Sequence, residues 1–93
     1  MGRQRARALR SELADFFELP KDILLDLPRI TLLGNLRLVI ENHRGLIQYE
    51  PVQIRVCLEK GEVVLQGSNL NISLISKEEI VIDGQLKGVE FHD

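Results

Sequence analysis

The sequence is poor in the residues on which many functions depend. Its 93 residues include one cysteine, no tryptophan and only 4% aromatic side chains. A single cysteine, Cys57, excludes an internal disulfide and is typical of a reducing compartment. So few aromatic side chains cannot form a stacking platform for nucleic acid, and the net charge of −2 gives no general attraction to phosphates. We therefore expect no nucleic-acid partner.

Long hydrophobic runs are also missing. The longest unbroken apolar stretches have three residues, such as Ile23 to Leu25, whereas a membrane-spanning helix needs roughly 18. The first residues are basic but are not followed by the long apolar segment of a secretory signal. We therefore expect the protein to stay in the cytoplasm.

The side chains that carry out catalysis or hold metals are scattered along the chain. His43 lies in a predicted turn and His92 is next to the last residue, so no cluster has the spacing of a metal site. Cys57 lies in an alternating segment, where we expect a buried and inert thiol. Neither a glycine-rich phosphate loop nor a nucleophile elbow is present. The sequence therefore predicts a protein that is not an enzyme and needs no cofactor or metal.

Residues 1–28 predict a helix and a short connector bounded by prolines. Over residues 3–18, apolar side chains recur at spacings of three and four and share one side of the predicted helix: Ala6, Leu9, Leu13, Phe16 and Phe17. Much of the remaining surface of the first two turns is basic, with Arg3, Arg5, Arg7 and Arg10. Two interpretations stay open. The segment contacts a membrane surface or a partner, or its apolar side covers the domain's own sheet.

From residue 29 to the C-terminus, apolar residues alternate with others, which predicts β-strands. Gly34, Pro51, Gly67 and Gly84 divide this region into four units of about seventeen residues, each with a β segment on either side of the breaker. The first three units end in polar turns of hairpin length. We expect a mainly β domain over residues 29–93, a curved antiparallel meander of Gly/Pro-kinked hairpins. Four long kinked strands, or eight short strands that fold back at the glycines, both fit; the alternative is a short β-solenoid with about 17 residues per turn.

Both faces of the predicted strands carry apolar residues. Five of them lie off the main alternation: Leu33, Val39, Val64, Ile75 and Val81. A flat sheet covered on one side only would leave many of them in contact with water, so either the sheet curls onto itself or a partner covers the second face. Self-association is one consequence that we expect.

Residues 19–35, LPKDILLDLPRITLLGN, resemble the opening of proteins of the YabP/YqfC sporulation family. Four later segments resemble the family's repeated hydrophobic-x-hydrophobic-x-Gly steps: Val63–Gly67, Leu70–Ile72, Ile80–Gly84 and Val89–Phe91. The resemblance implies a protein made in the mother cell of an endospore-forming bacterium and linked with spore maturation. It also implies a membrane protein of the YqfD type as partner, and no catalytic residue.

Two functional hypotheses follow from these features. The first is a non-enzymatic adaptor or scaffold that acts with a membrane protein and contacts the membrane around the forespore peripherally. Its contacts would be electrostatic through Arg3, Arg5, Arg7 and Arg10, and helix-in-groove through Leu9, Leu13, Phe16 and Phe17. The alternative is a small-ligand or regulatory binding module, which predicts a concave pocket with convergent polar groups under the curved sheet.

Overall fold

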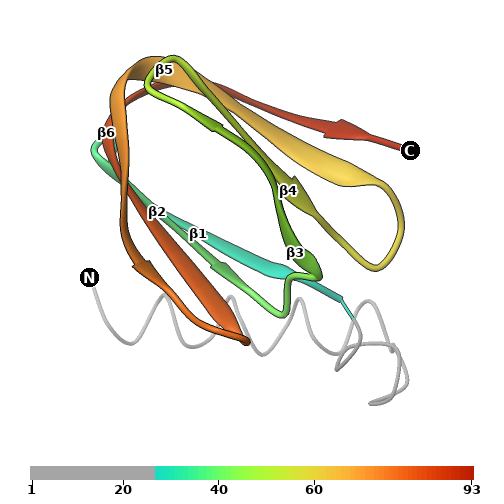
Figure 1. The fold of residues 1–93 in the computed structure, drawn as a ribbon. Helices are drawn as coiled ribbons and strands as arrows, with labels where there is room; N and C mark the ends of the chain where they lie inside the picture. The colour runs from blue at the N-terminus through green and yellow to red at the C-terminus, as the bar shows by residue number, and fades with distance from the viewer. Residues whose placement is uncertain (1–26) are drawn as a thin grey trace, which may run out of the picture.

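The computed structural model describes residues 27–93, which form one antiparallel sheet of six strands (Figure 1). The strands are β1 (Arg29–Leu33), β2 (Arg37–Glu41), β3 (Gly45–Glu50), β4 (Gln53–Cys57), β5 (Glu62–Ile75) and β6 (Glu79–His92). Their order across the sheet is β1-β2-β6-β5-β4-β3, and the sheet is not closed: β1 and β3 are its edge strands, and the ends of β5 and β6 each pair on one side only. The helix predicted over residues 3–18 and most of the connector lie outside the described residues.

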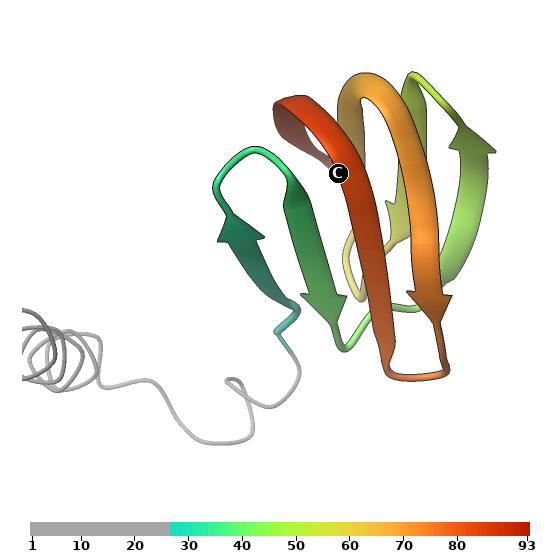
Figure 2. The ribbon, with the colours of Figure 1, turned by 90° about the vertical axis from the view of Figure 1, so that its left-hand side faces the viewer.

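The two central strands bend sharply near their middle (Figures 1 and 2). Gly67 in β5 and Gly84 in β6 lie at these bends. A Cβ atom at Gly67 would collide with the carbonyl oxygen of Gln85, and Gly84 has a φ of +137°, which strains any residue with a side chain. The bends turn the sheet back over itself, so that its two halves face each other.

The two halves have the same strand arrangement. The first half consists of β1, β2, the start of β6 and the end of β5; the second consists of β3, β4, the start of β5 and the end of β6. In each half, the turn of the hairpin is bonded to the bend of a long strand. The N–H of Gly84 donates to the carbonyl of Leu36 (3.1 Å), and the N–H of Gly67 donates to the carbonyl of Val52 (3.0 Å).

The antiparallel sheet predicted from the sequence is confirmed, and the β-solenoid is wrong. The four breakers act in two different ways. The chain reverses in the turns at Gly34 and Pro51, whereas Gly67 and Gly84 lie within strands that continue through them. These two strands do not fold back, because β5 and β6 pair with each other on both sides of the bend.

The sheet is also not a meander in chain order. The polar turn that ends the first unit, residues 42–45, was predicted to close a hairpin. Instead, residues 42–44 carry the chain from β2 to β3, which do not pair with each other. The place beside β2 is taken by β6, which pairs with it over five residues. A connection between the two halves was therefore mistaken for a hairpin within one of them.

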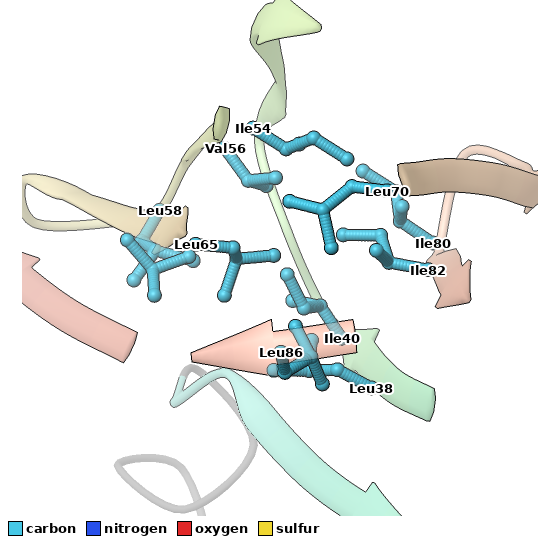
Figure 3. Packing of buried hydrophobic residues seen from close by; sticks show 11 residues of the cluster. Leu38, Ile40, Ile54, Val56, Leu58, Leu65, Leu70, Ile80, Ile82 and Leu86 are labelled. Carbon is cyan, nitrogen blue, oxygen red and sulfur yellow. The ribbon is translucent and has the colours of Figure 1, made fainter. Parts of the chain in front are cut away.

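The hydrophobic core fills the concave side of the bent sheet (Figure 3). Its eleven buried residues are all aliphatic: Leu38, Ile40, Ile54, Val56, Leu58, Val63, Leu65, Leu70, Ile80, Ile82 and Leu86. Because the halves face each other, each half removes the inner face of the other from water, as two packed sheets do. The concave polar pocket predicted by the ligand-binding alternative is not found among residues 27–93, since apolar side chains occupy that space.

Candidate interaction surface

The eight interaction residues predicted from the sequence lie outside the described residues, so their role stays a prediction. They are Arg3, Arg5, Arg7, Arg10, Leu9, Leu13, Phe16 and Phe17. Residues 27–93 offer other surfaces that a partner could contact. These are the outer faces of the two halves and the two edge strands.

The histidine and the cysteine that could be reactive, His43 and Cys57, are both built into the structure of the sheet. The buried His43 joins the β2–β3 connection to its neighbours: its Nδ1 accepts from the N–H of Gly45 (2.9 Å), and its Nε2 lies 2.8 Å from the carbonyl oxygen of Ser76. Cys57 is half-buried in β4. Within residues 27–93, no group of three or more His, Cys, Asp or Glu residues could hold a metal ion. In the same part of the chain, no helix is long and apolar enough to cross a membrane.

The outer face of the first half carries a row of four side chains from four strands, which we call the apolar row. The strand register places Thr31 beside Val39, Val39 beside Val81, and Val81 beside Leu74. The two valines point away from the core because their neighbours in sequence point into it. They are half-buried, whereas 47% of Leu74 is exposed. The apolar row is therefore a hydrophobic stripe across the full width of this half.

A bulge in β5 places Leu74 in the apolar row. Leu70, Ile72 and Leu74 alternate with other residues in the sequence, a pattern that would place all three on one face of a regular strand. The register shifts between Ile72 and Leu74, so that Leu74 lies opposite Val81 on the outer face. Ile75 then lies opposite Ile80, a core residue, and belongs to the concave side.

Charged side chains border the apolar row on both sides. Toward the bend, Arg37 binds both carboxylate oxygens of Asp83, with 3.1 Å between Nη2 and Oδ2. Hydrogen bonds from Arg37 and then from Ser73 lower the pKa of the Asp83 carboxyl. On the other side, Glu41 lies 3.7 Å from Arg29 in an exposed ion pair. The apolar row is thus bordered by two ion pairs, Arg37–Asp83 on one side and Arg29–Glu41 on the other.

A shallow depression with an acidic rim lies at one end of the apolar row. It is lined by Glu41, Asn42, Leu74, Ser76, Glu78 and Glu79. The side-chain amide of Asn42 also donates to the carbonyl oxygen of Leu27 (3.2 Å), the first residue that the structure describes. The chain therefore enters the sheet at the rim of this depression.

The outer face of the second half has a row in the same place, which we call the polar row. Its members pair across the four strands as those of the apolar row do: Gln48, Arg55, Val64 and Glu90. Arg55 donates to both carboxylate oxygens of Glu62 (3.1 and 2.8 Å) and to the side-chain oxygen of Gln48 (3.4 Å). The hydrogen bonds from Arg55 to the carboxylate of Glu62 are the main reason why the pKa of Glu62 is lowered. Only 4% of Val64 is exposed, so the one apolar member of the polar row is almost completely buried.

The two edge strands differ in accessibility. β3 contains a bulge between Leu46 and Gln48, and its Tyr49 hydroxyl accepts from the N–H of Ile72 in β5 (3.1 Å). β1 pairs with β2 without a register shift, and each of the two edge strands contains one charged residue, Arg29 in β1 and Glu50 in β3. Bulges and charges are the usual features that keep an edge strand from pairing with other chains. β1 is therefore the more accessible edge.

The exposed leucines of the β1 edge lie on both faces of the sheet. Leu32 pairs with the core residue Leu38 and belongs to the concave side, whereas Leu33 pairs with Arg37 and belongs to the outer face. Their exposed fractions are 52% and 57%. An added strand would thus meet apolar side chains on either face.

The five apolar residues that do not follow the main alternation in the sequence lie at different places in the sheet. Val39 and Val81 meet in the apolar row, and Leu33 lies next to that row on β1. Val64 is buried in the polar row, and Ile75 belongs to the concave side. The sequence analysis did not identify Thr31 as a member of this face. It lies two residues before Leu33, and this spacing places both on the same face of the strand.

Comparison with known proteins identifies the family. The model of the YabP family matches residues 26–93, which include the whole described sheet. The chain is 38% identical over 88 residues to the uncharacterized protein YqfC of Bacillus subtilis (strain 168), and the match covers 95% of each chain. No solved structure gives a significant match. The chain therefore belongs to the YabP family, a family of sporulation proteins.

Proposed function

We propose that the protein is a non-enzymatic adaptor in spore formation that binds a protein partner by strand addition at the β1 edge. The observation that carries this proposal is the contrast between the edges: β1 is free of bulges, whereas β3 is bulged and held to β5 through Tyr49. A strand added to β1 would satisfy its open backbone groups and cover parts of Leu32 and Leu33.

The partner that we propose is a membrane protein of the YqfD type, contacted from the cytoplasm of the mother cell at the membrane around the forespore. Family membership supports the sporulation setting. The four arginines at positions 3, 5, 7 and 10 support peripheral contact, since basic segments are attracted to anionic lipid surfaces. The filled concave side of the sheet favours this adaptor over a small-ligand binding module.

One pair of matched substitutions tests strand addition. The full chain with Leu32→Lys is compared with Leu46→Lys in pull-downs from sporulating cells. Both leucines lie at the concave side of an edge strand and are partly exposed, 52% and 38%. An inward-pointing lysine protects natural edge strands from pairing. We expect recovery of the membrane partner to fall at least about tenfold with Leu32→Lys, more than 1 kcal/mol of binding free energy, and to be unchanged with Leu46→Lys.

Circular dichroism and gel filtration establish that both variants keep the fold. Equal recovery of the partner with the two variants contradicts the proposal. It is also contradicted if light scattering shows that the strand bound at β1 belongs to a second copy of the chain and no other protein is recovered.

A further inference from the structure

We propose that residues 3–18 of the same chain bind across the apolar row and cover the outer face of the first half. This inference does not depend on strand addition at β1. It is supported by the uncovered state of the apolar row, by the charge of its surroundings, and by the place at which the chain enters the sheet.

The apolar row lacks the cover that its counterpart has. In the polar row, Arg55 reaches across to Glu62 and Gln48, and Val64, which pairs with Arg55 and Glu90, is almost completely buried. In the first half, the position of Arg55 is taken by Val39, whose side chain reaches no carboxylate. The neighbouring arginines of this face pair with Glu41 and Asp83 beside the row. Among residues 27–93, the apolar row is therefore left partly in contact with water.

The sequence of residues 3–18 has the pattern that this face requires. On the predicted helix, the apolar residues share one side, and Arg5 and Arg10 flank that side. A helix of this length measures about 24 Å, and four strands about 4.8 Å apart present a row of roughly 14 Å. The apolar side of the helix is thus long enough to cover the whole row.

The charges around the apolar row are complementary to the flanking arginines. Three carboxylates, Glu41, Glu78 and Glu79, line the depression at its end. Of the cations nearby, Arg29 pairs with Glu41 and Arg44 pairs with Glu59, whereas Glu78 and Glu79 have no ion-pair partner among residues 27–93. Opposite charges at the rim orient a docked basic helix and add to the burial of its apolar side.

The connection between the segment and the sheet favours an occupant from the same chain. Leu27 is bonded to Asn42 at the rim of the depression, and Leu74 of the apolar row lines the same depression. The eight residues 19–26 can span at most about 28 Å, which is ample for this distance. A segment tethered so close has a high effective concentration at the row, on the order of millimolar, and competes well with a second copy.

The experiment uses cross-linking within the full chain. Cys57→Ser removes the native thiol, and Phe17→Cys together with Leu74→Cys places one thiol on the segment and one in the apolar row. A short bismaleimide at low protein concentration is expected to link the two within one chain in most molecules. The control pairs Phe17→Cys with Gln66→Cys, an exposed position on the outer face of the second half, and we expect at least fivefold less product.

A further substitution separates binding from simple tethering. Leu13→Asp on the apolar side of the segment should lower the Leu74 product to the level of the Gln66 control, whereas Ser11→Asp, on the other side of the predicted helix, should not. Equal products at Leu74 and Gln66, or no response to Leu13→Asp, would overturn the proposal. Links between two chains in place of links within one would also overturn it, and would assign the apolar row to a second copy.

Discussion

The two halves of the sheet share one backbone arrangement and differ on their outer faces. Each half has a hairpin that pairs with a long strand and a turn that is bonded to the bend. At matching positions the first half has Val39 and Leu74, and the second half has Arg55 and Glu90. The comparison shows that inward residues decide how the halves pack, while a few outward residues decide whether the apolar side chains of an outer face are buried or partly exposed.

The inner faces show no such difference. The first half contributes Leu38, Ile40, Ile80 and Ile82 to the core, and the second contributes Ile54, Val56, Val63 and Leu65; all eight are fully buried. Both sets are aliphatic because they share one water-free space between the halves. The outward positions do not have to be apolar, so the outer faces of the two halves can differ in composition.

The largest effect is expected at the bend that joins the halves. Gly67→Ala should unfold the protein or lower its free energy of unfolding by about 3 kcal/mol or more, because the new Cβ would overlap the backbone of Gln85. Gly34→Ala is the matched control: Gly34 has a φ of +57° but open space around it, and its substitution should cost only about 1 kcal/mol. Urea unfolding measures both. If both substitutions lower the free energy of unfolding equally, the bend does not depend on close approach of the two long strands.

An intermediate effect is expected when the outer faces are exchanged. Glu79 lies relative to Val39 as Glu62 lies relative to Arg55. Val39→Arg should therefore form the same ion pair on the first half and change the free energy of unfolding of the sheet by no more than about 1 kcal/mol. In the cross-linking experiment it should lower the yield between residues 17 and 74.

The reverse substitution, Arg55→Val, extends the same comparison. It should place a second valine beside Val64 on the outer face of the second half and leave Glu62 without its main partner, so we expect concentration-dependent association measurable by light scattering. A chain that stays monomeric at high concentration would show that an uncovered outer row is tolerated without a partner.

The smallest effect is expected from acid. The pKa values of Glu62 and Asp83 are lowered in the folded protein, chiefly by hydrogen bonds from Arg55 and Arg37. Because the folded pKa is below the unfolded value, each pair stabilises the fold above the unfolded pKa, near pH 4, and the stabilisation is lost as the pH falls through the folded pKa. Glu62→Gln and Asp83→Asn should each make the midpoint of urea unfolding less dependent on pH in this range. An unchanged acid response in both variants would contradict a stabilising role for these pairs.

Most strands of the sheet could be predicted from the sequence, whereas their pairing order and register could not. The alternation of apolar residues predicted the strands. The four breakers were recognised as special positions, but the chain reverses between strands only at Gly34 and Pro51, whereas β5 and β6 continue through Gly67 and Gly84. Whether a break reverses or bends the chain depends on which strand pairs beside it, and this is a long-range property. The bulge before Leu74 depends in the same way on the register of β5 against β6.

By itself, the sequence determined that this protein is β-rich and has an aliphatic core, because period-two alternation and side-chain chemistry are local properties. It also provided the family resemblance that the comparison then established. Only the tertiary structure decided that Thr31, Val39, Val81 and Leu74 form one surface. They come from four strands and lie up to fifty residues apart in the chain, and the register of hydrogen-bonded strands aligns them. Neighbours on a sheet are set by pairing, which the sequence order does not contain.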